Sequence, residues 1–360
     1  MRCSLRRALL LIAVLLAGHS PSAQFRIPEI PFDSAPDVLK GLPDDVYIGE
    51  AVGVATNSRG NLFVFTRTGS PQVTLATERH LARGNGGARL FEFDRSGKYL
   101  REIGQGSYGS LFAHTVRVDP EDNIWAVDEG SNTITKFNPQ GQVLMILGRR
   151  PENIRVPGLE PAAPPPAPSG PIGAGVMGDQ FNRPTDVAWD KQGNIFVADG
   201  YGNSRIAKFD RNGRFVKSWG SRGIAPGQFN TPHTIATDAQ GNVYVGDRGN
   251  RRIQVFDNDG AFKTQFLNVG APWAICITPG PHQYLYSSNS NGTREFDANG
   301  EIYKMELDGR IVGKFGRAGR GMKEFSSVHE IDCRNENELY VGEITSWRVQ
   351  KLTLRPSQVK

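Results

Sequence analysis

Residues 233–266 read HTIATDAQGNVYVGDRGNRRIQVFDNDGAFKTQF. Four short segments of this stretch, at 233–237, 242–246, 252–256 and 261–266, alternate apolar and polar side chains and are bounded by Gly, Asn or Asp. Alternation over about five residues is typical of half-buried strands, and turn residues at their ends are typical of hairpins. The stretch therefore predicts four antiparallel strands joined in order, with no helix.

The same pattern recurs along the chain. Five further copies share an apolar strand, a polar turn that ends in Gly-Asn or an equivalent, and a second apolar strand; they begin at Val52, His114, Thr185, Trp273 and His329. Units of about 40–50 residues with four strands each are typical of β-propellers. We therefore predict an all-β chain in which residues 52–355 form a six-bladed β-propeller.

The ends of the repeat array predict how the ring closes. The last copy has three evident strands and ends near Leu354, so we expect the segment at 24–51 to supply the fourth strand. Closure removes exposed sheet edges. A Pro-rich stretch at 157–172 interrupts the repeat, and because proline cannot join a regular ladder we expect an insertion there. Residues 356–360 are expected to form a C-terminal tail.

Three of the six histidines share one position of the repeat: His114, His233 and His329 begin copies two, four and six. In a closed ring, alternate blades place three imidazoles around one mouth of the central channel, which is a metal-binding geometry. A single histidine at a strand start is usually a polar rim residue, but the shared, alternating position favours a metal site. His80 and His282 lie outside this position and are expected at the surface.

Two further side chains are expected near the histidines. The loop after the second strand returns to the mouth where the first strand begins, because the two strands are antiparallel. Arg67 and Tyr201 follow second strands and can converge there; the alternatives are a surface arginine and a packed loop aromatic. The aspartates that end second strands, Asp128, Asp199 and Asp247, are expected to bond backbone amides and fix turns.

The N-terminus predicts export. Residues 1–23 combine basic side chains, an apolar core at 8–17 and small residues near Ala23, which is typical of a signal peptide. The mature protein is therefore expected to be periplasmic or secreted. The apolar core is too short for a transmembrane helix, so we expect no membrane span.

The net charge of +5 includes arginines of this leader, and no basic run with interleaved aromatics indicates nucleic-acid binding. We expect a monomer.

Two cysteines remain after the leader. Cys276 and Cys333 fall in the first strands of neighbouring copies. We expect buried free thiols, with a disulfide as the lesser alternative, since two cysteines cannot form a disulfide-rich framework.

Several segments carry a family resemblance. DGYGNSRI at 199–206 and DRGNRRIQVF at 247–256 resemble NHL repeats. Together with FNRPTDV at 181–187, FNTPHTI at 229–235 and the three histidines, they resemble peptidyl-α-hydroxyglycine α-amidating lyases over essentially the whole chain after the leader. That resemblance implies a reaction that splits the C–N bond of a carbinolamide into a peptide amide and glyoxylate.

The resemblance also implies roles for individual residues. His114, His233 and His329 match the family's zinc ligands. Tyr201 matches a general base toward the substrate hydroxyl, and Arg67 matches the cation that lowers the pKa of the tyrosine and steadies the substrate's negative charge.

A structural calcium ion is a further implication of the resemblance. Its ligands would be the carbonyl oxygens of Val54 and Val116 and the carboxylate of Glu330, which stands where the family has aspartate. Gly202 stands where animal members carry a cysteine, so the associated disulfide is absent.

Three functions remain open. The first is a zinc lyase acting on a small-molecule or peptide carbinolamide, with a natural substrate that can differ from peptidyl-α-hydroxyglycine. The second is a metal-dependent propeller hydrolase such as a lactonase, although calcium-dependent propeller lactonases use Asp, Asn and Glu ligands. The third is a non-catalytic NHL propeller that binds a peptide, glycan or protein, which leaves the alternating histidines unexplained.

Overall fold

The computed structural model describes residues 27–44, 46–68, 87–106, 110–148, 178–290 and 299–355. The expected leader, His80, the Pro-rich insertion and the tail at 356–360 lie outside these ranges. Within them, no helix is long and apolar enough to cross a membrane.

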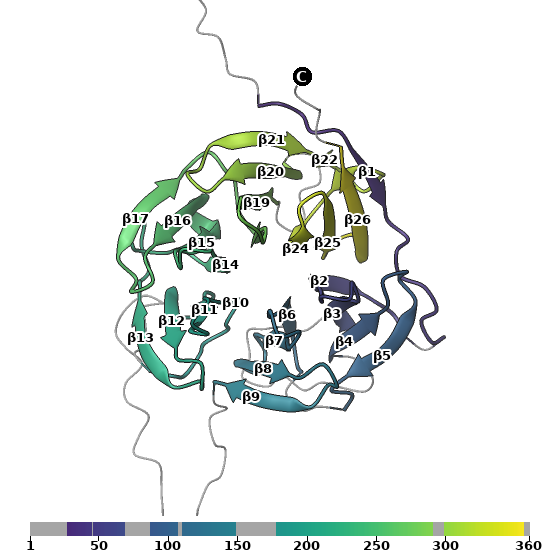
Figure 1. Ribbon diagram of the computed structural model, residues 1–360, viewed down its shortest axis with the longest axis horizontal. Coiled ribbons are helices and arrows are strands. Elements are labelled where there is room, and N and C mark those ends of the chain that lie inside the picture. The colour runs from purple at the N-terminus through teal and green to yellow at the C-terminus, as the bar shows by residue number, and fades with distance from the viewer. Residues whose placement is uncertain are drawn as a thin grey trace, which may run out of the picture.

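Six four-stranded sheets surround a central axis (Figure 1), which confirms the predicted six-bladed all-β propeller. The first sheet holds β2 (Glu50–Thr56), β3 (Leu62–Thr68), β4 (Gly87–Phe93) and β5 (Tyr99–Ile103), and the second holds β6 (Ala113–Val118), β7 (Ile124–Asp128), β8 (Thr133–Phe137) and β9 (Val143–Leu147). The third holds β10 (Asp186–Trp189), β11 (Ile195–Asp199), β12 (Arg205–Phe209) and β13 (Phe215–Trp219).

The fourth sheet holds β14 (Pro232–Thr237), β15 (Val243–Asp247), β16 (Arg252–Phe256) and β17 (Phe262–Phe266), within a residue of the strands expected from its sequence. The fifth holds β18 (Ile275–Ile277), β19 (Tyr284–Asn289), β20 (Glu301–Glu306) and β21 (Ile311–Phe315). Short elements complete the described chain: the 3-10 turn η1 (Arg248–Asn250), and β22 (Arg317–Ala318), which pairs in parallel with β23 (Glu324–Phe325).

The sixth sheet joins the two ends of the chain. It holds β24 (Val328–Asn335), β25 (Glu338–Glu343), β26 (Arg348–Leu354) and, on its outer side, β1 (Phe32–Ala35). β1 lies beside β26 (Figure 1). The two strands pair antiparallel, with Phe32 opposite Leu354. The ring is therefore closed by backbone hydrogen bonds between the first and last strands.

Local sequence explains the turns. In the fourth sheet, the carboxylate of Asp257 accepts hydrogen bonds from the backbone N–H groups of Asp259 (2.9 Å) and Ala261 (2.8 Å). Gly260 has a φ of +85°, and a Cβ at this position would lie 2.5 Å from the ring of Trp219. This turn therefore requires glycine both for its backbone conformation and for its contact with the third sheet.

The aspartates at the ends of second strands hold the loops that enter the blades. Asp128 accepts from the N–H groups of Leu111 (2.9 Å) and Phe112 (2.8 Å). Asp199 and Asp247 make the equivalent contacts, to the N–H groups of Asn182 and Asn230. These carboxylates set the position of the residues just before each first strand.

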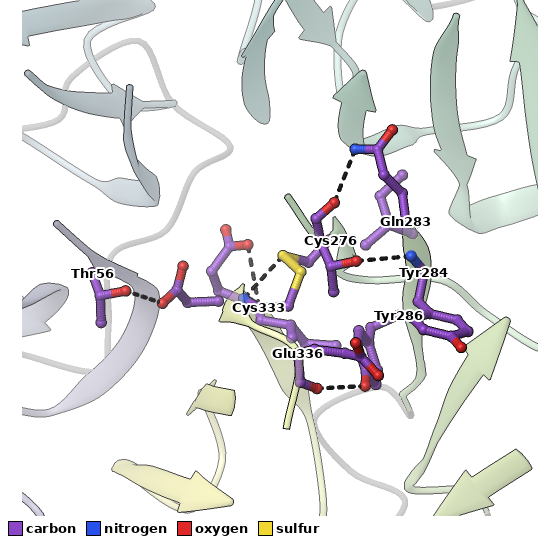
Figure 2. Close-up of a disulfide and its surroundings, with 12 residues drawn as sticks. Thr56, Cys276, Gln283, Tyr284, Tyr286, Cys333 and Glu336 are labelled. Carbon is purple, nitrogen blue, oxygen red and sulfur yellow. Dashed lines mark hydrogen bonds between the residues drawn. A yellow bond between two sulfur atoms is a disulfide. The ribbon is translucent and has the colours of Figure 1, made fainter. Parts of the chain in front are cut away.

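The two cysteines form a disulfide, so the expected free thiols are wrong. Figure 2 shows the bond between Cys276 in β18 and Cys333 in β24, whose Cα atoms lie 5.9 Å apart. The first strands of neighbouring blades lie side by side around the channel, and that arrangement brings together two residues separated by 57 positions. The bond joins the fifth blade to the sixth.

Removing this bond is expected to lower the free energy of unfolding by about 2–4 kcal/mol, because the cross-link restricts a long loop in the unfolded chain. Urea unfolding of the double variant Cys276→Ser, Cys333→Ser, compared with the oxidised parent, measures the loss. The parent unfolded in a reducing agent should match the variant, and an unchanged midpoint in both would contradict the expectation.

Candidate metal centre

Three histidine side chains meet at one mouth of the channel. His114, His233 and His329 come from β6, β14 and β24, and all are buried. Their ring centroids lie 4.6 to 4.8 Å apart, and their nearest nitrogens all lie within 4.8 Å of one another. Zinc bound at 2.0–2.1 Å holds such nitrogens about 3.4 Å apart, so small inward movements would close the site.

Backbone carbonyls orient two of the three imidazoles. Nδ1 of His233 lies 2.6 Å from the carbonyl oxygen of Trp273, and Nδ1 of His329 lies 2.7 Å from that of Val52. Each acceptor occupies the aligned repeat position in the next blade. Because Nδ1 donates to a carbonyl, the lone pair of each ring lies on Nε2 and faces the centre. Nδ1 of His114 is buried without a hydrogen-bond partner.

The environment keeps these imidazoles neutral. Burial is the main cause that lowers the pKa of each ring, and it lowers the pKa of His329 to about 3 with a further contribution from the Arg67 guanidinium. Neutral imidazole is the form that binds a metal ion. Three neutral nitrogen donors fit zinc, and among the described residues this is the one such group of His, Cys, Asp or Glu ligand atoms.

Tyr201 lies directly against the triad. It follows β11, and its Oη lies 3.2 Å from Nε2 of His114 and 3.1 Å from Nε2 of His233. Burial raises the pKa of Tyr201, and the strongest opposing influence is Arg248. Tyr201 therefore lies at the histidine mouth.

Arg67 of β3 also reaches this mouth, where it contacts both its own blade and the second blade. Its Nε donates to the carbonyl of Ala113 (2.8 Å), and its Nη1 pairs with Glu50 (3.0 Å). Its guanidinium lies 3.8 Å from the ring centroid of Phe112. Arg67 lowers the pKa of Tyr201 through space, yet less than Arg248 does.

Sequence reasoning did not single out Arg248 and Glu129. Arg248 follows β15, its Nη1 lies 3.4 Å from Tyr201 Oη, and its guanidinium lies 4.6 Å from the ring centroid of Trp273. Glu129 follows β7, and its Oε2 lies 3.8 Å from Nε2 of His114. Both occupy the loop position after a second strand, which is the same signal that identified Tyr201.

The expected calcium ligands do not fit a calcium ion. Glu330 is buried, with Oε2 accepting from the hydroxyl of Thr115 (2.9 Å) and Oε1 paired with Arg117 (2.9 Å). A positive guanidinium thus pairs with the carboxylate that the resemblance assigns, with the carbonyls of Val54 and Val116, to a calcium ion. The sequence-based expectation of calcium here is therefore not supported by the donor set.

Arg117 instead connects most of the ring from within the channel. On β6, it pairs with Asp186 of β10 (2.6 Å) as well as with Glu330 of β24. Its Nη2 also lies 3.5 Å from the Thr234 hydroxyl and 3.3 Å from the carbonyl of Ile275. One guanidinium therefore contacts the first strands of four other blades.

A cavity of about 490 Å³ lies beyond this guanidinium. Its walls include Arg117, Trp189, Thr278 and Arg334, and none of the three triad histidines lines it. The residues of its rim follow the ends of first strands, whereas the histidines stand at their starts. The histidine nitrogens lie at the other mouth, which is therefore the candidate metal site.

Two segments of the chain match a known repeat family. The NHL repeat family matches residues 181–209 and 229–256. NHL repeat-containing protein 3 of Mus musculus is 30% identical over 75% of this chain and 74% of its own length. The chain belongs to the NHL-repeat proteins.

This NHL-repeat protein is also similar to amidating lyases. Peptidyl-alpha-hydroxyglycine alpha-amidating lyase 1 of Drosophila melanogaster is 26% identical over 87% of the chain and 58% of its own length. The peptidyl-glycine alpha-amidating monooxygenase of Mus musculus is 28% identical over 87% of the chain, but the match spans 31% of that longer protein.

Among solved structures, a gluconolactonase from Xanthomonas campestris has a TM-score of 0.53 at 15% identity, covering 86% of this chain and 88% of the other. That likeness shows the propeller fold alone.

Proposed function

We propose that this protein is a metal-dependent lyase that splits the C–N bond of a carbinolamide, with a peptidyl-α-hydroxyglycine-like substrate giving an amide and glyoxylate. The observation that carries the proposal is the position of the Tyr201 hydroxyl within 3.2 Å of Nε2 of two triad histidines. Similarity to the Drosophila lyase over 87% of the chain supports it. The triad nitrogens would hold the metal, and zinc bound there would supply a Lewis acid that acidifies a substrate hydroxyl.

The side chains of the site would move the protons. The positive charge of a bound metal ion would join Arg248 in opposing the effect of burial on the pKa of Tyr201 and so favour the phenolate. The phenolate takes the proton of the substrate hydroxyl; the oxygen becomes the aldehyde oxygen of glyoxylate while the C–N bond breaks. The electron pair of that bond goes to the amide nitrogen, which takes a proton back from Tyr201. Arg248, 3.4 Å from the phenol oxygen, stabilises the phenolate. Arg67 of the first blade adds positive charge and favours a substrate that carries a carboxylate.

Metal content and glyoxylate release from a model peptidyl-α-hydroxyglycine test the proposal together. We expect one zinc ion per chain and metal-dependent release of glyoxylate, both lost in His329→Ala. The matched control is His282→Ala, because His282 is largely exposed and outside the triad. Zinc without glyoxylate release would contradict the lyase, and lactone opening by the same zinc-loaded protein would favour a hydrolase. A protein that binds no metal would favour a binding propeller.

A further inference from the structure

Glu129 is a buried carboxylate at the edge of the histidine triad. Its side chain is 1% exposed, and its backbone N–H donates to the carbonyl of Phe112 (3.1 Å). Oε1 accepts a hydrogen bond from Nη2 of Arg183 (3.1 Å). Oε2 has no hydrogen-bond partner and lies 3.8 Å from Nε2 of His114. One oxygen is anchored, therefore, while the other lies near a ligand atom of the triad.

An unsatisfied carboxylate oxygen in the interior is costly unless a cation or a donor reaches it. His114 cannot be that cation once it binds a metal through Nε2, because the ligand must then be neutral. Arg183 already contacts Oε1, and its guanidinium lies over the ring of Tyr201 at 4.5 Å. The missing partner of Oε2 is therefore expected on the metal side of the site.

The charge around the triad also favours a carboxylate beside the metal ion. A divalent ion on three neutral imidazoles adds two positive charges to a mouth that already holds Arg67 and Arg248. Among carboxylates of the described residues, Glu129 alone has an oxygen within 4.0 Å of a triad nitrogen. At such separations in a poorly hydrated site, opposite charges attract strongly.

We propose that Glu129 is the outer-sphere carboxylate of the metal centre, offsetting the charge of the ion and accepting a hydrogen bond through Oε2 from the group at the open position. We assign it to the outer sphere because the group of mutually close ligand atoms consists of the three histidines without Glu129. The inference rests on the proposed function only in requiring a metal at the triad. Arg183 is then a positioning residue, because its contact with Oε1 leaves Oε2 facing His114.

Glu129→Gln tests this role, because it removes the charge and keeps nearly the same shape. The dissociation constant for zinc, measured by competition with a chelator, is expected to rise about 10- to 100-fold, as is typical when a group next to metal ligands is lost. In the cobalt-loaded protein, the visible absorption bands are expected to shift, because they report the field around the ion. The matched control is Glu50→Gln, which removes a carboxylate at the same mouth that pairs with Arg67; its zinc affinity and cobalt bands should stay close to those of the parent.

Unchanged affinity and bands in Glu129→Gln would overturn the proposal, as would an equal loss of affinity in Glu50→Gln. If circular dichroism shows that the Gln variant does not fold, Glu129→Asp replaces it; this variant keeps the charge but withdraws the oxygen by one methylene. Intermediate zinc affinity supports the role of Glu129, and parental affinity with parental bands overturns it. Zinc binding without glyoxylate release would contradict the lyase and leave this test intact, whereas a parent that binds no zinc would overturn both.

Discussion

Replacing Tyr201 with phenylalanine is expected to lower kcat for glyoxylate release by about 10²- to 10⁴-fold, the usual contribution of a positioned proton-transfer group. The phenol oxygen lies 3.2 Å and 3.1 Å from Nε2 of His114 and His233, so it stands beside the place where a substrate hydroxyl would bind. Phenylalanine keeps the packing of the ring beneath Arg183 and removes only the oxygen. The three imidazoles remain, and zinc stoichiometry should therefore be unchanged.

The measurement combines steady-state kinetics with metal analysis of the same preparation. Tyr47→Phe is the matched control, because Tyr47 is 75% exposed and outside the site, and its kinetics should equal those of the parent. Undiminished kcat in Tyr201→Phe, with zinc bound, would exclude Tyr201 as the base. Loss of zinc from that variant would instead show that the phenol oxygen contributes to metal binding.

The triad could be predicted because a repeat converts sequence position into spatial position. His114, His233 and His329 share one place in alternate copies, and closure of the ring then brings them together. Antiparallel pairing likewise brings Tyr201 to the same mouth. Arg248 and Glu129 also follow second strands and reach the same mouth. The aspartate before each of them indicates a structural turn, and the sequence does not show that the same loop also contributes to the site.

Other features depend on contacts between blades, which the repeat does not encode. Whether Cys276 and Cys333 bond is decided by the distance between β18 and β24, not by their spacing in sequence. The pairing of Glu330 with Arg117, which argues against the expected calcium ion, could not be predicted for a related reason. Position 117 lies within a strand whose pattern fits the repeat, and nothing in that pattern shows that the side chain enters the channel.

Arg117→Met is expected to lower the free energy of unfolding by about 3–5 kcal/mol, the usual cost of removing one partner of a buried ion pair. The carboxylates of Asp186 and Glu330 are both about 1% exposed, and the variant would leave two buried negative charges without their shared cation. Urea unfolding followed by circular dichroism measures the loss. Arg310→Met is the matched control, because Arg310 is 65% exposed and its pair with Glu306 lies at the surface; its unfolding free energy should change little.

A rescue variant separates charge from packing. Adding Asp186→Asn and Glu330→Gln to Arg117→Met removes both unpaired buried charges, and most of the lost stability should return if electrostatics cause the loss.

The same reasoning predicts that a calcium chelator leaves the unfolding midpoint of the parent unchanged, because the guanidinium already supplies the positive charge between these carboxylates. If the chelator lowered the unfolding midpoint and added calcium restored it, Arg117 would not be the cation that pairs with these carboxylates and connects the blades.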